Sequence, residues 1–257
     1  MPNLESSMPN FNPNSTLEAY VQDGLNEVEG WCGSVESVLH LGHLASLQED
    51  CDEYGAFEIG VHRGRYLIAL HAMCAPGTRS LGLDLFEGDQ EKNVDQSGHG
   101  DATITRGNID NFAREPNLID LRYGDSLAIT DPEIQAIKEE FGGFRISSVD
   151  GGHTPIHVFR DTMTAAALSA PGGLISIDDF FHTNFPGVTE GIYRLLDSKA
   201  QPFVPLMVNR KKLILCHLSY LQTYRTQLDE GRREGAFSGI GCKRVQIAGY
   251  DVLSFYH

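Results

Sequence analysis

Basic residues are scarce in this chain of 257 residues, and long apolar runs are absent from it. Lys and Arg number 20 against 35 Asp and Glu, which gives a formal net charge of -15. So acidic a chain lacks the cations that replace phosphate counterions, and we therefore expect no nucleic-acid partner. Attraction to an anionic membrane surface is excluded on the same ground. No apolar stretch approaches the roughly 20 residues that a membrane-spanning helix needs.

Cysteines are few, and none forms a C-x-x-C pair. The five cysteines are scattered along the chain at Cys32, Cys51, Cys74, Cys216 and Cys242. An odd, scattered set in a chain of this length is typical of reduced thiols, so we expect a cytoplasmic protein. The amino terminus has no basic stretch followed by an apolar one, so it indicates no secretory signal.

Composition and length predict a single packed domain. Hydrophobic residues make up 41% of the chain and charged residues 21%, which supports a core and argues against disorder. Residues 1–16 are rich in Asn, Pro and Ser, which is typical of a flexible arm. We expect one domain over residues 17–257. It comprises N-terminal helices in 17–50, a core in 55–217 and a C-terminal extension in 218–257.

From residue 55 onward, short β-type segments alternate with helical patterns. The expected strands are 56–59, 80–85, 119–123, 144–149 and 174–177. The expected helices between and after them are 65–74, 102–113, 132–141, 155–169 and 187–196. This alternation predicts an α/β fold, in which a parallel sheet carries helices on both faces.

Two further expected strands, 203–208 and 213–216, lie too close together for a crossover helix. They must therefore pair as an antiparallel hairpin. The predicted fold is a doubly wound, Rossmann-like, seven-stranded and mostly parallel sheet that ends in this hairpin. A helix and two short strands would form the mixed C-terminal extension. The polar segment 87–101 is expected to be a long loop that closes over the site as a lid.

Ligands in open α/β sheets bind at the carboxyl ends of the strands, so the residues that follow each strand are the candidate site. The first such turn runs from Glu58 through Gly60 to Gly64, with His62 where a dinucleotide-binding G-x-G-x-x-G has its middle glycine. Glu58 would be unfavourable beside a pyrophosphate and favourable beside an ammonium or sulfonium. The turn therefore predicts a phosphate-free, cationic cofactor, with a turn that binds no ligand as the alternative.

Two more aspartates follow strands. Asp84 ends the second strand, where a carboxylate can accept two ribose hydroxyls. It would do so for NAD as well, so it indicates an adenosine-containing cofactor without selecting one. Asp125 follows the third strand, at a position that commonly lies against the adenine. The sequence around Asp125 is equally typical of an ordinary turn.

Three carboxylates follow the fourth and fifth strands. Asp150 comes after the fourth strand, and Asp178 and Asp179 come after the fifth. Neighbouring strand ends would gather like charges that need a cation or a proton between them. Mg²⁺ takes oxygen ligands of this kind, and it would orient a substrate hydroxyl and lower its pKa. The alternative is that Asp178 and Asp179 only cap the following loop.

Two histidines accompany these aspartates at the same spacing. His153 lies three residues after Asp150, and His182 lies three residues after Asp179. Histidine is the usual general base near neutral pH, so both are candidate catalytic residues. A purely structural hydrogen-bonding role is the alternative for each of them.

Several segments, taken in order, resemble class I S-adenosylmethionine (SAM)-dependent methyltransferases of the Methyltransf_24 type. These are GWCGSVESVLHL, FEIGVHRGRYLIAL, LGLDLF, VDGGHT, APGGLISIDDF and FPGVTEGIYRLL, which cover roughly residues 30–197. That group is similar to the metal-dependent sugar O-methyltransferases of antibiotic biosynthesis. The resemblance implies a cofactor site made by Glu58, Gly60, Gly64, Asp84 and Asp125, with Asp150 beside it. It also implies that Asp150, Asp178 and Asp179 bind Mg²⁺.

The chain departs from this pattern at Gly152, where some of those enzymes carry a carboxylate base. Either a histidine supplies the base, or the metal-assisted mechanism does not apply. We expect O-methylation of a small-molecule hydroxyl, without excluding transfer to nitrogen or carbon. A nicotinamide-dependent oxidoreductase is the first alternative, and His62 and the terminal hairpin disfavour it. A non-catalytic SAM-binding module is the second. The two terminal segments are suitable elements for a homodimer.

Overall fold

The computed structural model describes residues 16–48, 51–235, 237 and 241–256. All but the last residue of the predicted arm 1–16 lie outside these ranges. The described strands are β1 (Gly55–Ile59), β2 (Ser80–Asp84), β3 (Ile119–Tyr123), β4 (Phe144–Val149), β5 (Ser169–Ile177), β6 (Phe203–Asn209), β7 (Lys212–His217), β8 (Gly241–Ile247) and β9 (Tyr250–Tyr256). The described helices are α1 (Thr16–Ala19), α2 (Val35–Ser46), α3 (Arg65–Ala72), α4 (Ala102–Phe112), α5 (Asp131–Phe141), α6 (Pro155–Leu168), α7 (Pro186–Ser198) and α8 (Leu221–Glu234).

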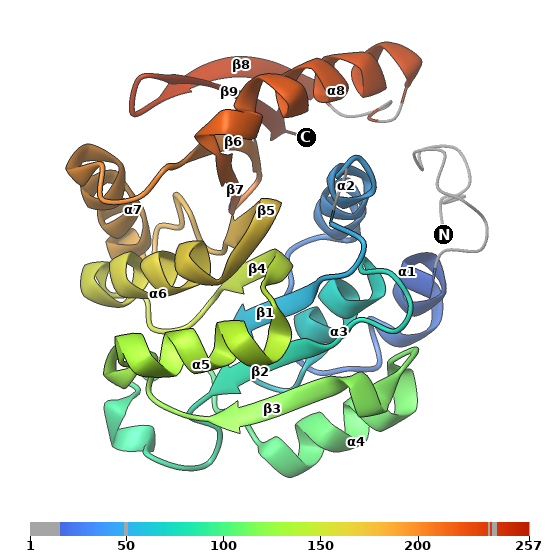
Figure 1. Cartoon of the computed structure of the whole chain (residues 1–257), viewed down its shortest axis with the longest axis vertical. Coiled ribbons are helices and arrows are strands. Elements are labelled where there is room, and N and C mark those ends of the chain that lie inside the picture. Colours follow the sequence, from blue (N-terminus) through green and yellow to red (C-terminus); the bar gives the residue numbers. More distant parts are fainter. Residues whose placement is uncertain (1–15, 49–50, 236, 238–240, 257) are drawn as a thin grey trace.

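The strands form one sheet in the order β3-β2-β1-β4-β5-β7-β6-β9-β8 (Figure 1). Strands β1 to β5 are parallel, and β7 is antiparallel to both β5 and β6. The short connection between β6 and β7 predicted the second of these antiparallel pairs. Apolar residues of α2, α3 and α8 pack together on one face, and those of α6 and α7 pack on the other. The predicted α/β fold is therefore confirmed.

The expected size of the sheet was wrong: in the described part of the chain it has nine strands rather than seven, because the two short strands expected in the C-terminal extension join it. Strand β9 pairs in parallel with β6, with Met207 opposite Leu253, and β8 pairs with β9. Without β9, strand β6 would be an edge with unpaired backbone groups. Val252, Leu253 and Phe255 are buried in this position, so their apolar side chains also favour joining the sheet.

Strand β5 begins at Ser169, earlier than the expected residue 174. The segment Pro171-Gly172-Gly173 ends α6 as expected but is itself part of the strand. Distant side chains bond its carbonyl groups. Gln48 Nε2 donates to Gly172 O at 3.1 Å, and the Tyr224 hydroxyl donates to the same oxygen. Such long-range bonds have no signal in the local sequence.

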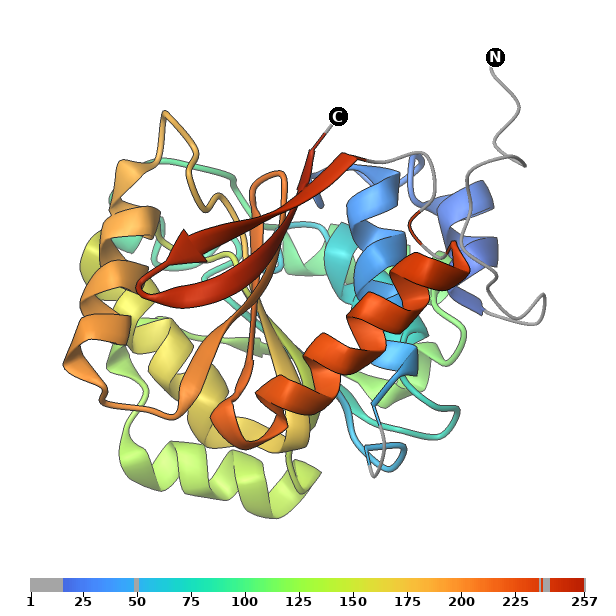
Figure 2. The same cartoon turned by 90° about the horizontal axis from the view of Figure 1, so that it is seen from above.

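Local sequence signals account for several helix starts. Ser34 accepts a hydrogen bond from Ser37 N at the start of α2, and Asp101 accepts one from Ile104 N at the start of α4. Figure 2 shows α8 crossing α2 at an angle, and Gln227 Nε2 of α8 donates to the oxygen of Leu47, the residue after α2, at 3.1 Å. None of the described helices combines the length and apolar character that a membrane crossing demands.

Candidate functional site

A cavity of about 820 Å³ opens at the carboxyl ends of β1, β2, β4 and β5. Most of the residues singled out in the sequence line it: Glu58, Gly60, Asp84, Asp125, Asp150, His153, Asp178, Asp179 and His182. Gly64 is the exception: it is the residue just before α3, with a φ of 87°, and it does not line the cavity. The strand order therefore brings these distant positions to one place, as expected for ligands at strand ends.

The turn after β1 depends on Gly60. Its φ is 87°, and an added Cβ would lie 2.0 Å from the backbone oxygen of Asp150. Gly60 N donates to Leu83 O, and Asp150 N donates to Ile59 O, both at 2.9 Å. Glycine is required because the ends of β1 and β4 approach so closely. This approach places Asp150 beside the end of the strand that carries Glu58.

Glu58 is buried in the cavity wall, with only 1% of its surface exposed. Its Oε2 atom has no hydrogen-bond partner among the described residues. Burial raises the pKa of this carboxyl well above its ordinary value, although the nearby Lys212 ammonium opposes the rise. An unpartnered buried oxygen is unfavourable, so a donor group on a ligand would complete it. The amino group of SAM fits this requirement.

Asp84 orders the two turns beside it. Its Oδ2 accepts a hydrogen bond from His62 N, and its Oδ1 accepts one from Phe86 N, both at 2.7 Å. Burial raises the pKa of Asp84, and these bonds partly offset the rise. Carboxylate oxygens accept more than one bond each, so Asp84 retains acceptor capacity toward the cavity. Asp125 has a similar double role, because Leu127 N donates to its Oδ1 at 2.9 Å while the residue lines the cavity.

Asp178 pairs with a lysine that the sequence analysis did not single out. Lys212 Nζ donates to Asp178 Oδ2 at 2.7 Å, and Asp179 N donates to Asp178 Oδ1 at 2.8 Å. Lys212 is 2% exposed, and its ammonium lies 4.0 Å from the centre of the Tyr66 ring. Burial would raise the pKa of Asp178, but the charge and hydrogen bond of Lys212, together with the bonds from Asp179 N and Asp150, outweigh burial and hold the pKa below its ordinary value.

The donor atoms that gather for a metal ion belong to Asp150, His153 and Asp179. In the described part of the chain, one ligand atom from each of them lies within 4.8 Å of the others. Two of the three predicted aspartates thus meet beside a histidine, while Asp178 neighbours Asp150 and is paired with Lys212. Burial and the neighbouring Asp178 raise the pKa of Asp150 well above its ordinary value. Two carboxylates and an imidazole are a donor set suited to a divalent cation.

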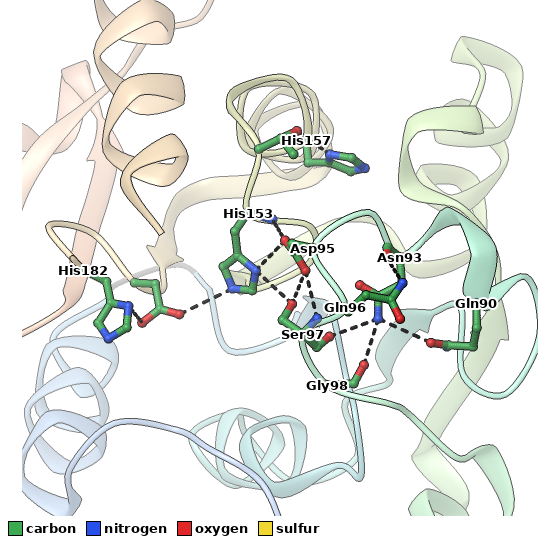
Figure 3. Close-up of polar contacts among 11 residues, drawn as sticks. Gln90, Asn93, Asp95, Gln96, Ser97, Gly98, His153, His157 and His182 are labelled. Carbon is green, nitrogen blue, oxygen red and sulfur yellow. Dashed lines mark hydrogen bonds and ion pairs between the residues drawn. The ribbon is translucent and has the colours of Figure 1, made fainter. Parts of the chain in front are cut away.

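His153 lies between two carboxylates (Figure 3). Its Nδ1 is 2.9 Å from Asp95 Oδ2, and its Nε2 is 3.4 Å from Asp179 Oδ2. Its ring stacks on Phe185 with 3.9 Å between ring centres. Burial would lower the pKa of His153, but the bonds to Asp179 and Asp95 outweigh burial and raise it. No motif distinguishes Asp95 within its polar loop, so the sequence gives no signal for this contact.

His182 stands farther from the acidic groups. Its Nδ1 lies 3.9 Å from Asp179 Oδ1 and has no hydrogen-bond partner among the described residues. Its ring also stacks on Phe185, with 5.2 Å between ring centres. Both predicted histidines therefore contact Asp179, His153 through its Nε2 and His182 through its Nδ1.

The packing around Gly152 explains why no carboxylate stands there. A Cβ at this position would lie 2.7 Å from two ring carbons of His157. The His157 ring is itself fixed, with Nδ1 2.6 Å from Thr154 Oγ1. The departure at Gly152 is therefore part of the packing of the turn, and a base must come from another residue.

This sheet order, with an antiparallel β7 beside β5 and a cavity at the strand ends, defines the class I methyltransferase fold. A family described as a methyltransferase domain matches residues 57–180. The resemblance stated from the sequence is therefore confirmed. A search of curated protein sequences finds no match.

Solved structures of O-methyltransferases are similar to this chain. The enzyme from Bacillus cereus, in complex with S-adenosylhomocysteine (SAH), is 21% identical, with 81% of this chain and 92% of that chain covered and a TM-score of 0.51. TomG from Streptomyces achromogenes, involved in tomaymycin synthesis and solved with SAM, is 17% identical, with 80% and 90% covered and a TM-score of 0.52. NovP is 14% identical, with 72% and 80% covered and a TM-score of 0.53. At these identities the likeness establishes a shared fold.

Proposed function

We propose that this protein is a SAM-dependent methyltransferase that methylates a hydroxyl group of a small molecule. The observation that carries the proposal is the unpartnered Oε2 of Glu58, buried in the wall of the cavity that Asp84 and Asp150 also line. A cationic ligand with an amino group satisfies this oxygen, whereas a pyrophosphate would meet a row of carboxylates. The large negative net charge of the chain favours the same kind of ligand.

SAM supplies the methyl group on a positively charged sulfur. In the proposal, Glu58 and Gly60 bind its methionine end, Asp84 binds the ribose, and Asp125 lies on the adenine side. Gly64 contributes indirectly, because it starts helix α3 behind the turn. The protein holds the two reactants together, an effect worth up to about 7–11 kcal/mol of the barrier.

His153 is the proposed general base for the acceptor hydroxyl. Its Nε2 faces Asp179 at one end of the cavity, and the Phe185 ring holds the imidazole plane. Proton removal by a positioned imidazole contributes typically about 10²–10⁴-fold. His182, whose Nδ1 has no hydrogen-bond partner among the described residues, is the second imidazole at the same end.

Mg²⁺ remains a proposal. A divalent cation would be held by Asp150, His153 and Asp179, and it would orient the acceptor hydroxyl and lower its pKa. Asp178 would then act as the partner of Lys212, not as a ligand. With His153 on the cation, His182 would be the imidazole left to accept the proton.

Calorimetry with SAH and with NAD tests the cofactor. We expect SAH to bind with one site per chain and NAD to show no binding. Glu58→Gln should weaken SAH binding by about tenfold or more, since the charged bond to the amino group is lost. Glu53→Gln, an exposed change just before β1, is the matched control and should leave it unchanged.

The outcomes separate the three functions. Binding of NAD without SAH would refute the proposal in favour of an oxidoreductase. For transfer, radiolabelled SAM is incubated with a panel of phenols and hydroxylated sugars, and methylated products are counted. Binding of SAH with no transfer to any panel member, nor to amines, would favour the non-catalytic module.

A further inference from the structure

A loop far from His153 in the sequence supplies its main polar partner. Asp95, in the loop between β2 and α4, accepts a hydrogen bond from His153 N at 2.8 Å, and the same oxygen lies 2.9 Å from His153 Nδ1 (Figure 3). The other oxygen accepts bonds from the backbone N, at 3.0 Å, and the hydroxyl of Ser97. These contacts with His153 and Ser97 hold the Asp95 carboxylate in a fixed orientation.

The segment around Asp95 is held together by its own side chains. Asn93 Nδ2 donates to Ser97 O at 3.1 Å and to Gly98 O at 2.9 Å. Asn93, Val94, Ser97 and Gly98 also line the cavity, so this segment forms one of its walls.

The contacts of Nδ1 with Asp95, at 2.9 Å, and with the Ser97 hydroxyl, at 3.0 Å, decide which way the imidazole faces. A carboxylate accepts hydrogen bonds, so Asp95 holds a proton on Nδ1 of His153 and turns Nε2 toward Asp179, which makes Nε2 the nitrogen that exchanges a proton with the cavity. The stacked Phe185 ring, 3.9 Å away, holds the ring plane. Whether Nε2 receives a proton or binds a metal ion, it needs this orientation.

We propose that Asp95 is a positioning residue that couples the loop to the site: closure of residues 87–101 over the cavity and orientation of His153 are one event. His153 is then oriented for its role only when residues 87–101 cover the cavity and exclude water from it. The catalytic part of this inference rests on the proposed function. The coupling itself rests only on the contacts between Asp95 and His153.

The test compares Asp95→Ala and Asp95→Asn with Glu91→Gln, a change at an exposed position of the same loop. The ¹⁵N signals of the imidazole report which nitrogen of His153 carries the proton, and hydrogen exchange reports opening of residues 87–101, both with SAH bound. For Asp95→Ala we expect a mixed tautomer and faster exchange. Asp95→Asn keeps one carbonyl acceptor, so it should partly restore the wild-type tautomer of His153 and the slow exchange of residues 87–101. Glu91→Gln should match the wild type in both measurements.

Methyl transfer provides the second readout. In Asp95→Ala, kcat should fall by about 10- to 100-fold, as for other residues that orient a functional histidine. The affinity for SAH should change less than kcat, because Asp95 contacts His153 and not Glu58 or Asp84. A wild-type tautomer together with wild-type exchange in Asp95→Ala would overturn the inference. A wild-type protein that transfers no methyl group would refute the proposed function, while tautomer and exchange still decide the role of Asp95.

Discussion

Lys212 donates a hydrogen bond of 2.7 Å to Asp178, and so sets an ammonium group beside the carboxylates that the sequence assigns to a metal ion. The two residues meet because β7 pairs with β5, with Ile177 opposite Leu213. Both are buried, at 2% and 9% exposure. One of the three acids is therefore already neutralised by the protein, and Asp150 and Asp179 are the two that remain for a cation.

Lys212→Met should destabilise the protein strongly. It leaves Asp178 buried without its partner, a change that typically costs about 3–5 kcal/mol. Lys211→Met, at the exposed neighbouring position, should change the free energy of unfolding by about 0.5 kcal/mol or less. Urea unfolding measures both. Equal stability of the two variants would contradict the structural importance of the pair.

Binding of Mn²⁺ should depend on Asp179 more than on Asp178. Electron paramagnetic resonance measures this binding, with Mg²⁺ as the competitor. Asp179→Asn removes a carboxylate from the set formed with Asp150 and His153, so affinity should fall by about tenfold or more. Asp178→Asn should have a smaller effect, because that carboxylate already binds Lys212. An equal loss in both variants would favour the ligand set of three aspartates.

Gly60→Ala should impair folding far more than Gly77→Ala. Both glycines have a left-handed backbone, with φ of 87° and 84°. An added Cβ at Gly77 meets nothing within 4 Å, so only the backbone strain of about 1–2 kcal/mol applies there. At Gly60 the Cβ would lie 2.0 Å from Asp150 O, so the ends of β1 and β4 must separate. Thermal unfolding and SAH calorimetry measure the difference, and similar melting temperatures would argue against this close approach.

Asp161 should make stability fall with rising pH. This residue of α6 is fully buried, and burial raises its pKa from 3.8 to about 7. Its proton stays bound in the folded state after the unfolded chain has released it, so the stabilisation is complete below pH 4 and is lost as pH rises through about 7. Asp161→Asn cannot lose a proton and should flatten this part of the stability curve.

The control for that measurement is Asp197→Asn, an exposed aspartate of α7. Urea unfolding from pH 4 to pH 8 in the three proteins gives the comparison. The control should show the same change in the free energy of unfolding with pH as the wild type. If Asp161→Asn shows the same change as well, another group is responsible for the pH dependence.

Local patterns in the sequence were sufficient for most of the fold. Alternating apolar and helical segments predict β1 to β7, since each depends on residues close in the chain. Because parallel strands end at one edge, positions such as Glu58, Asp84 and Asp150 follow without any knowledge of their contacts. The sequence by itself therefore determined the class of fold and the edge of the sheet that carries the cavity.

Only the tertiary structure decided which of these groups are partners. Lys212 is the first residue of β7 and Asp95 lies in a polar loop, and neither has a local pattern that points to Asp178 or His153. The addition of β8 and β9 to the sheet likewise depends on the open edge of β6, which exists only after the sheet has formed. Charge pairing and strand addition are set by distances through space, and the order of residues along the chain does not contain those distances.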